Sequence, residues 1–453
     1  MKQTNPNRAK FVKLTGIALG LGLILFLNST LPTAGATENY TLYLPITIGG
    51  VGQPGPDGDE DTIPLALEEA GTTIEGAAVI SPYTGDDNQN NQAVAFYRPA
   101  GGAEWLPIQE VTVDYTNRQW NIGLAGLLPD TDYEVEVRYQ DADGVTPPIV
   151  STTVHTQIIY STFFPVSTEV AAAGHEEEIR DALQAVQALG INLVIQSFAE
   201  DSTEADWQAF LDVAAEEGLW VIPGFQDAPP VWNGTDFDLG VNEPFLQAMS
   251  DHPAVYAYWL IDEPFHEKHN WTITAERLQL LYQQARAVAP NLPMAVQFSR
   301  EIMRGEQNPG DTYDFRDGMC DICVISALEF RDFGDGPQFY SDVLIENHTI
   351  SRAVIRREAP QAQIWTTAQV FGDAHGNSSY YMPSPAEVQA MTDLLLSPEL
   401  QAAGQLNGIV WQQWTSPHLQ QAPGQFTLGD VSMSGQREVV TETAVDLDLP
   451  LVP

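Results

Sequence analysis

Basic residues are scarce in this sequence. Its 453 residues contain 19 lysines and arginines against 61 aspartates and glutamates, which gives a formal net charge of −42 at pH 7. A surface of this charge repels phosphate backbones and anionic lipid headgroups, so we expect no nucleic-acid partner. The 43% of hydrophobic residues excludes a wholly disordered chain and predicts a globular protein.

The motifs of several enzyme classes are also missing. No G-x-S-x-G is present, as an α/β-hydrolase would require, and no glycine-rich loop ends in Lys-Ser/Thr, as in phosphate-binding loops. His266, Glu267 and His269 lie close together, but their H-E-x-H spacing differs from the i,i+4 histidines of helical zinc sites. We therefore predict neither a metal site nor a cofactor.

Three of the few lysines lie at the N-terminus. They precede an apolar run from Leu14 to Leu27, which is followed by Ala34-Gly35-Ala36. A positive segment, a short apolar segment and an A-x-A site together indicate a signal peptide over residues 1–36. Export to the medium or the cell surface follows, with no stable membrane span after cleavage. A retained anchor is the alternative, although polar residues from Asn28 end the apolar run short of the ~20 residues that span a bilayer.

Only two cysteines occur, Cys320 and Cys323, as a lone C-x-x-C. Positions three apart in a strand face opposite sides, so a disulfide would require the start of the segment to turn. We expect two buried thiols.

The region after the signal peptide divides into a linker and a β-rich segment. Residues 37–62 end in a stretch rich in glycine, proline and acidic residues, which predicts a linker. From 63 to 156, short alternating runs are separated by turn clusters, as in an antiparallel sandwich. The expected strands are 77–81, 93–97, 108–115, 120–124, 133–139 and 149–155.

The β-rich segment resembles a fibronectin type III domain. The resemblance depends on Leu127-Leu-Pro129-Asp-Thr131-Asp-Tyr133, which has the L-x-P-x-T-x-Y spacing of that family's tyrosine corner. It implies a hydrogen bond between the Tyr133 hydroxyl and backbone upstream, and a spacer or binding role without chemistry.

From 157 to 453, apolar strand-like runs alternate with amphipathic helical stretches. The expected strands are 158–164, 192–198, 219–224, 255–261, 294–298, 322–328, 364–370 and 408–414, and the main helices are 176–189, 204–217, 275–289, 341–357, 385–396 and 436–446. Eight such units over ~290 residues predict an α/β fold of the TIM (β/α)8 barrel type. A doubly wound sheet is the alternative, but no G-x-G-x-x-G follows the first strand.

Two adjacent carboxylates, Asp262 and Glu263, follow the fourth barrel strand directly and precede Pro264. Active sites of barrels lie at this end of the strands. The crowding of these two carboxyl groups beside Trp259 favours a raised pKa for one of them, and a general acid requires such a protonated carboxyl. The alternative is a structural helix start, with Asp262 as a cap.

This strand end resembles that of the clan A glycoside hydrolases, whose fourth strand ends in Asn-Glu-Pro. The resemblance implies that Glu263 is the general acid/base and that Asp262 takes the place of a sugar-binding Asn. In that group the seventh strand supplies the nucleophile in a W-x-T-E-x-G segment. Here the segment is Trp365-Thr-Thr-Ala-Gln369-Val-Phe-Gly, so Gln369 takes the place of the nucleophilic Glu.

A second carboxylate must then come from another strand. Glu329, after the sixth strand, is the first choice, and Asp227 and Asp373 are further candidates. Separations of the two carboxyl groups near ~5 Å and ~6.5–9.5 Å would correspond to retention and inversion.

Aromatic and amide side chains near the strand ends favour a carbohydrate ligand, because sugar rings stack on aromatic faces and sugar hydroxyls bond to amides. They are Phe163, Phe164, Phe225, Trp232, Tyr258, Trp259, Phe298, Trp411 and Trp414, with Gln196, Gln226, Gln297, Gln369, Gln412 and Gln413. The sequence thus predicts an exported glycoside-hydrolase-like protein acting on polysaccharide or oligosaccharide. The alternative is a carbohydrate-binding or surface protein whose barrel has lost its nucleophile. No pattern indicates an oligomeric state.

Overall fold

The computed structural model describes residues 61–163, 171–225, 228–265, 273–307, 314–326, 328–332, 336–373, 380–412, 425–426 and 433–447. The expected signal peptide and most of the expected linker lie outside these residues. Thr62, at the end of that linker, is buried and forms a β-bridge with Val145. Within the described residues, no helix combines the length and the apolar character needed to cross a bilayer.

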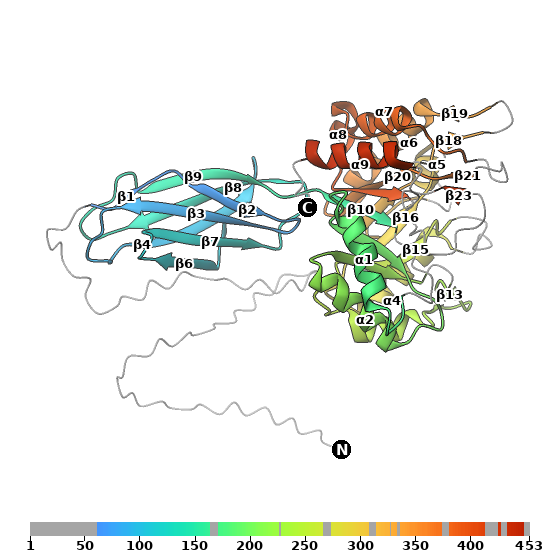
Figure 1. The fold of residues 1–453 in the computed structure, drawn as a ribbon, viewed down its shortest axis with the longest axis horizontal. Helices are drawn as coiled ribbons and strands as arrows, with labels where there is room; N and C mark the ends of the chain where they lie inside the picture. Colours follow the sequence, from blue (N-terminus) through green and yellow to red (C-terminus); the bar gives the residue numbers. More distant parts are fainter. Residues whose placement is uncertain are drawn as a thin grey trace, which may run out of the picture. The chain divides into compact units, whose positions relative to one another are not determined.

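Residues 63–155 form two antiparallel sheets (Figure 1). The first has the order β1 (Ile63–Pro64), β3 (Gly76–Thr84), β7 (Gln119–Ala125) and β6 (Glu110–Asp114), and β2 (Glu68–Thr72) also pairs with β3. The second has the order β5 (Leu106–Pro107), β4 (Gln92–Pro99), β8 (Asp132–Gln140) and β9 (Ile149–His155). The six predicted strands are all present, and β1, β2 and β5 are additional.

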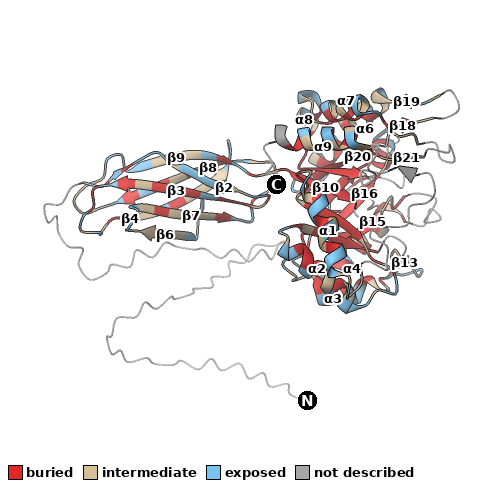
Figure 2. Cartoon of the chain, in the orientation of Figure 1, coloured by how far each residue is buried: buried red, intermediate tan, exposed pale blue. Residues whose placement is uncertain are grey.

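Buried and more exposed residues alternate along β8, and the buried ones belong to the core between the two sheets. Tyr133, Val135, Val137 and Tyr139 are buried, while the residues between them are more exposed (Figure 2). This period of two is that of a strand with one face on a core. The Tyr133 hydroxyl accepts a hydrogen bond from the backbone N–H of Leu128 at 2.9 Å, so the bond that the tyrosine-corner motif implies is present.

Eight parallel strands between residues 159 and 412 close into a barrel. They are β10 (Ile159–Phe163), β11 (Leu193–Ser197), β12 (Trp220–Gly224), β15 (Tyr258–Asp262), β16 (Met294–Phe298), β17 (Ile322–Ile325), β20 (Gln363–Gln369) and β22 (Gly408–Gln412). Because β10 pairs with both β11 and β22, the sheet has no edge. The barrel prediction is confirmed at all eight strands, and the doubly wound alternative is wrong.

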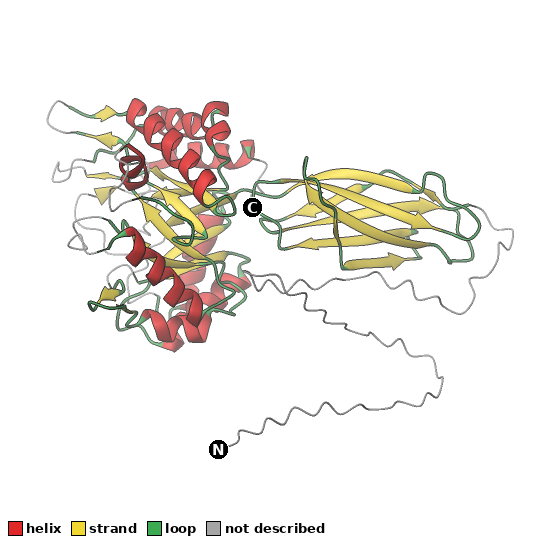
Figure 3. Cartoon of the chain, turned by 180° about the vertical axis from the view of Figure 1, so that it is seen from behind, coloured by secondary structure: helices red, strands yellow, loops and turns green. Residues whose placement is uncertain are grey.

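Helices lie around these strands on the outside (Figure 3). They are α1 (Glu176–Gln187), α2 (Glu204–Glu216), α3 (Asn242–Met249), α4 (Ala275–Val288), α5 (Glu301–Gln307), α6 (Ser341–Glu358), α7 (Pro385–Leu395), α8 (Pro398–Ala403) and α9 (Ser434–Asp446). Several of these helices begin at capping residues. Ser384 caps α7 in a capping box with Glu387, and Pro385 occupies the first turn.

Three short antiparallel strand pairs accompany the barrel: β13 (Val231–Trp232) with β14 (Phe237–Asp238), β18 (Phe330–Arg331) with β19 (Gln338–Phe339), and β21 (Gly372–Asp373) with β23 (Gln425–Phe426).

Two tryptophans fill the barrel interior, Trp259 of β15 and Trp365 of β20. Glycines on the neighbouring strands make room for them. A Cβ added at Gly224 would lie 2.7 Å from Cβ of Trp259, and one added at Gly408 would lie 2.8 Å from the Trp365 ring. Pairing large with small residues packs the interior without a pore.

The β2–β3 loop contributes Ile74 to the same interior cluster. Ile74 is 2% exposed and joins the first residues of several barrel strands, including Ile159, Leu193 and Ile322. Two hydrogen bonds accompany this contact: Gln157 Nε2 donates to the Thr72 carbonyl, and Asn407 Nδ2 donates to the Pro129 carbonyl. The side chain therefore closes the end of the barrel where its strands begin.

The two cysteines form a disulfide between Cys320 and Cys323, so the expectation of two thiols is wrong. The expectation assumed that both residues belong to a strand. In fact β17 begins only at Ile322, and Gly318, at φ +77°, turns the chain just before Cys320. The turn brings the two Cα atoms to 5.6 Å, within the range that a disulfide can bridge.

Replacing both cysteines by alanine is expected to lower the free energy of unfolding by about 2 kcal/mol, the chain-entropy value for so short a loop. Urea unfolding monitored by tryptophan fluorescence measures this. Adding a reductant should shift the midpoint of the native protein in the same direction and leave the double variant unchanged. Equal midpoints for the native and the double-alanine proteins would contradict a stabilising role.

Candidate functional site

Glu263 lies directly after β15, at the end of the barrel where the strands finish. Its backbone has φ +45°, and its N–H donates to the Gln297 carbonyl of the neighbouring strand β16 at 2.9 Å. A left-handed conformation is uncommon for a residue with a Cβ, and such strain concentrates at functional sites. The side chain is partly exposed, so it is accessible from the barrel mouth.

Glu301 is a second carboxylic acid near Glu263. It begins α5, three residues after β16 ends, and only 6% of it is exposed. Burial raises the pKa of the Glu301 carboxyl to about 7, and the charge of Glu263 adds to this increase. Its Oε2 atom has no hydrogen-bond partner in the described part of the chain. Glu301 therefore holds a proton at pH values where an ordinary carboxyl is ionised.

Glu329, between β17 and β18, is the third carboxylate and, like Glu301, is buried. It is 3% exposed and forms an ion pair with Arg300, whose Nη2 lies 2.6 Å from the Glu329 Oε2 atom. Burial raises the pKa of Glu329, while the charge of Arg300 opposes that increase.

Tyr380 interacts electrostatically with two of these groups, Glu263 and Glu329. Burial is the main cause of its raised pKa, and the charges of both Glu263 and Glu329 contribute to the increase. The Arg331 guanidinium lies 4.1 Å from the centre of the Tyr380 ring. The site thus combines three carboxyl groups, an aromatic ring and two arginines, which together can move protons and bind polar ligands.

Unpaired polar atoms occur on strands that end at the same mouth. The Nε1 of Trp259, the Oε1 of Gln297 and the Oε1 of Gln412 are buried without a hydrogen-bond partner among the described residues. Buried polar groups in proteins are normally bonded to protein or water. A ligand with many hydroxyl groups would supply both the acceptor and the donors that these atoms lack.

The other predicted site residues lie elsewhere or bond within the protein. Trp411 is fully buried and packs edge-on against Tyr160 in the layer between strands and helices, so it faces away from the mouth. Asp262 is partly exposed and pairs in register with Gln297. Gln226, Asp227 and Trp414 lie outside the described residues, as do His266, Glu267 and His269.

The side-chain amide of Gln369 forms hydrogen bonds with backbone groups. Its Oε1 accepts the N–H of Phe330, and its Nε2 lies within hydrogen-bond distance of the carbonyls of Phe330, Phe371 and Tyr381. The side chain is fully buried. Its amide therefore ties together the segments that follow β17 and β20.

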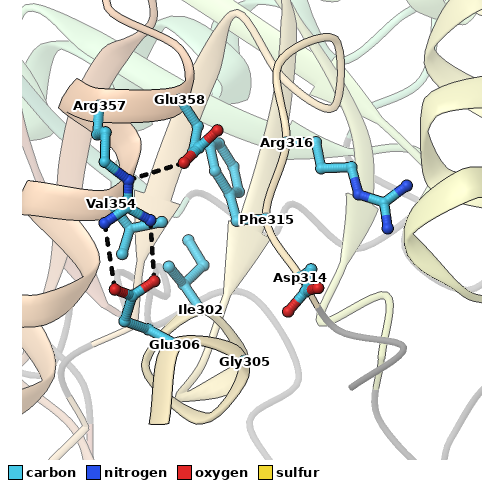
Figure 4. Close-up of a pocket in the computed structure, with 9 residues that line it drawn as sticks. All are labelled: Ile302, Gly305, Glu306, Asp314, Phe315, Arg316, Val354, Arg357 and Glu358. Atoms are coloured by element: carbon cyan, nitrogen blue, oxygen red, sulfur yellow. Dashed lines mark hydrogen bonds and ion pairs between the residues drawn. The ribbon is translucent and has the colours of Figure 1, made fainter. Parts of the chain in front are cut away.

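A pocket of about 530 Å³ lies elsewhere, between α5, residues 314–316 and α6 (Figure 4). Two arginines line it, Arg316 and Arg357, and Arg357 donates to both carboxylate oxygens of Glu306 and to Glu358. None of the three carboxyl groups of the mouth lines this pocket. We place the candidate site at the barrel mouth.

Glu301, Arg300 and Tyr380 are not among the site residues predicted from the sequence. Arg300 and Glu301 come just after the fifth strand, which is the positional signal that could have found them. Tyr380 lies in a connecting segment far from any predicted strand, and no sequence pattern marks it.

No protein-family model and no curated protein sequence matches the chain. Solved structures similar to it include a cell-surface-expressed, multi-modular chitinase from Paenibacillus (9% identity, 88% of this chain and 42% of that chain, TM-score 0.37). Others are a glycoside hydrolase family 5 protein from Bacteroides vulgatus (9% identity, 67% of each chain, TM-score 0.39) and a cyclomaltodextrinase (8% identity, 84% of each chain, TM-score 0.35). The chain spans less than half the length of the chitinase.

Proposed function

We propose that this protein is an exported glycosidase-like enzyme that hydrolyses O-glycosidic bonds of a polysaccharide, with Glu263 as the general acid/base. The observation that carries this proposal is the position of Glu263. It is partly exposed at the barrel mouth, in a left-handed conformation, and it interacts electrostatically with the buried acid Glu301. Paired carboxyl groups in unlike environments are how glycosidases divide acid and base roles.

Glu329 is the proposed second carboxylate. Its ion pair with Arg300 orients it, and its influence on Tyr380 places it within electrostatic reach of the ring that also interacts with Glu263. Tyr380, whose pKa both carboxylates raise, is a further proposed ligand contact. The other proposed ligand contacts are Asp262, Trp259, Gln226, Asp227 and Trp414. Trp411 and Gln369 are not proposed, because Trp411 packs against Tyr160 and Gln369 bonds to backbone.

The experiment is a panel of neutral and acidic polysaccharides, with the release of reducing ends as the measurement. We expect hydrolysis of at least one member, and Glu329→Gln is expected to abolish it. Glu306→Gln is the matched control, because Glu306 pairs with Arg357 outside the mouth. Full activity of Glu329→Gln on an established substrate would remove Glu329 from the mechanism.

A carbohydrate-binding protein without catalysis is the second candidate. One observation favours it: Gln369, where the clan A resemblance places a nucleophile, uses its amide for backbone bonds. Retention of the protein on an immobilised polysaccharide, together with the absence of reducing ends over the whole panel, would support this candidate and contradict the first.

Export remains part of the proposal. It is based on the pattern of residues 1–36, and a disulfide is typical of an oxidising compartment. The proposed domains are the fibronectin type III-like sandwich over 63–156, supported by the Tyr133 bond, and the barrel over 157–453. No nucleic-acid partner is proposed, because the net charge is −42.

A further inference from the structure

Glu263 and Glu301 follow neighbouring strands of the barrel. Asp262 of β15 is in register with Gln297 of β16, and the Glu263 N–H extends this pairing by one residue. Glu301 follows four positions after Gln297, at the start of α5. The two carboxyl groups therefore belong to adjacent strand ends, which agrees with the electrostatic interaction between them.

The surroundings of the Glu301 carboxyl favour its protonated form. Its Oε2 atom is buried with no hydrogen-bond partner in the described residues. The backbone at Ser299 and at Glu301 itself lowers the pKa of the carboxyl, but by less than burial raises it. A protonated carboxyl fits this arrangement, because the neutral form costs less to bury and its hydroxyl has a proton to donate.

We propose that Glu263 and Glu301 hold one proton between them, and that Glu301 is a positioning residue that keeps the general acid Glu263 supplied with this proton. This inference rests on the proposed function and names the source of the acid's proton. In a coupled pair of carboxyl groups, the retained proton belongs to the pair rather than to either residue.

The ordinary interpretation of Glu301 is a helix-start acid that interacts with the N-terminal end of the helix dipole. Such acids are exposed or have hydrogen bonds at both oxygens, as Glu387 of α7 does with Ser384 and the Tyr381 hydroxyl. Glu301 is buried and leaves one oxygen without a partner. Burying a carboxyl group costs free energy, and a residue that only caps a helix does not need to be buried.

The charged groups around Glu301 are consistent with a single retained proton. Glu263, from the end of β15, raises the pKa of Glu301, and Arg304, one turn along α5, lowers it by less than burial raises it. The adjacent cation Arg300 is engaged by Glu329.

Helix α6 packs against α5 and brings no further cation to Glu301. It presents Asn347 to the Ser299 carbonyl and Arg357 to Glu306, so neither side chain neutralises the Glu301 carboxyl.

The proton balance of the reaction is then simple. When the glycosidic C–O bond breaks, the leaving oxygen takes the proton, an O–H bond of the pair breaks, and both carboxyl groups are left ionised. A water molecule then gives its hydroxyl to the sugar carbon and its proton to the pair. No oxidant, reductant or other reactant is needed.

The first test is the pH dependence of Glu301→Gln. A lone glutamic acid ordinarily loses its proton near pH ~4.3. With no partner to share the proton, the alkaline limb of the rate profile is expected to move at least about one pH unit toward this value. The rate at the acidic optimum should stay within about tenfold of the native rate. Glu301→Asp should move the limb back, while Glu306→Gln should leave it unchanged. An unmoved limb in Glu301→Gln would overturn the proposal.

The second test needs no substrate. Infrared difference spectroscopy of the native protein at pH 6 should show the carbonyl band of a protonated carboxyl, and Glu301→Gln should remove it. Persistence of the band in that variant would contradict the proposal. If no polysaccharide is cleaved but the band disappears as expected, the shared proton stands and the proposed hydrolysis fails.

The Glu301→Gln variant is expected to fold. The folded protein retains the Glu301 proton up to about pH 7, whereas the unfolded chain loses it near pH ~4.3, so the free energy of unfolding falls between these two pH values and stays lowered above them. A neutral amide removes this destabilisation, so Glu301→Gln should melt at the native temperature or above at pH 8. A lower melting temperature at pH 8 would contradict the buried, protonated state of Glu301.

Discussion

Glu263→Gln is expected to reduce turnover of an established polysaccharide substrate at least about 10²-fold, the lower end of the contribution of general acid catalysis. The amide has nearly the same shape as the carboxyl but cannot give up a proton to the leaving oxygen. Because the side chain is partly exposed at the barrel mouth, the variant is expected to fold normally. Initial rates of reducing-end release over a range of pH measure the effect.

Binding separates this chemical effect from loss of the site. Calorimetric titration with the same polysaccharide should give a Kd for Glu263→Gln within a few fold of the native value, since the ligand contacts remain. Unchanged turnover would remove Glu263 from the mechanism. A parallel loss of binding and turnover would instead make it a ligand contact.

Arg352→Leu is expected to lower the free energy of unfolding by about 3 kcal/mol or more. Arg352 is fully buried on α6, and burial lowers its pKa to about 9, so it remains a cation at pH 7. It donates to the carbonyls of Leu395 and Gly404, where α7 and α8 end, and to Nδ1 of His348. Helix C-terminal ends carry partial negative charge, which stabilises this cation, and leucine would leave all three acceptors buried without a donor. Urea unfolding gives the free energy.

Arg357→Leu is the matched control on the same helix. Arg357 is exposed and paired with Glu306 and Glu358, and exposed ion pairs contribute at most about 1 kcal/mol. Equal losses for the two variants would show that the buried bonds of Arg352 contribute no more than a surface pair.

The fold could be predicted because each barrel strand is a continuous apolar run and each long helix has a clear period. The predictions from sequence fail where tertiary packing, and not the local sequence, determines the structure. The helices α3, α5 and α8 have at most eight residues and show too few turns for a helical period. Trp411 was expected at the mouth, yet alternation along β22 turns Val410 inward and Trp411 toward the helices.

The candidate site could be predicted in part. The carboxylates Asp262 and Glu263 are next to each other after an apolar strand, so chain order alone draws attention to them. Glu301 belongs to a segment whose composition is that of an exposed helix start, and only the packing of α5 against the barrel buries it. No sequence pattern gives a burial of that kind, and none gives the left-handed backbone of Glu263, because glutamate rarely adopts it.

Ile74 has a consequence for how the chain can be divided. A fragment that begins at residue 157 would contain all eight barrel strands but would lack the side chain that packs against Ile159, Leu193 and Ile322 where those strands begin. That fragment would expose an apolar opening to water and lose the bonds made by Gln157 and Asn407. Expression of the barrel by itself is thus expected to give an aggregation-prone product, and truncation studies should retain the chain from residue 61 onward.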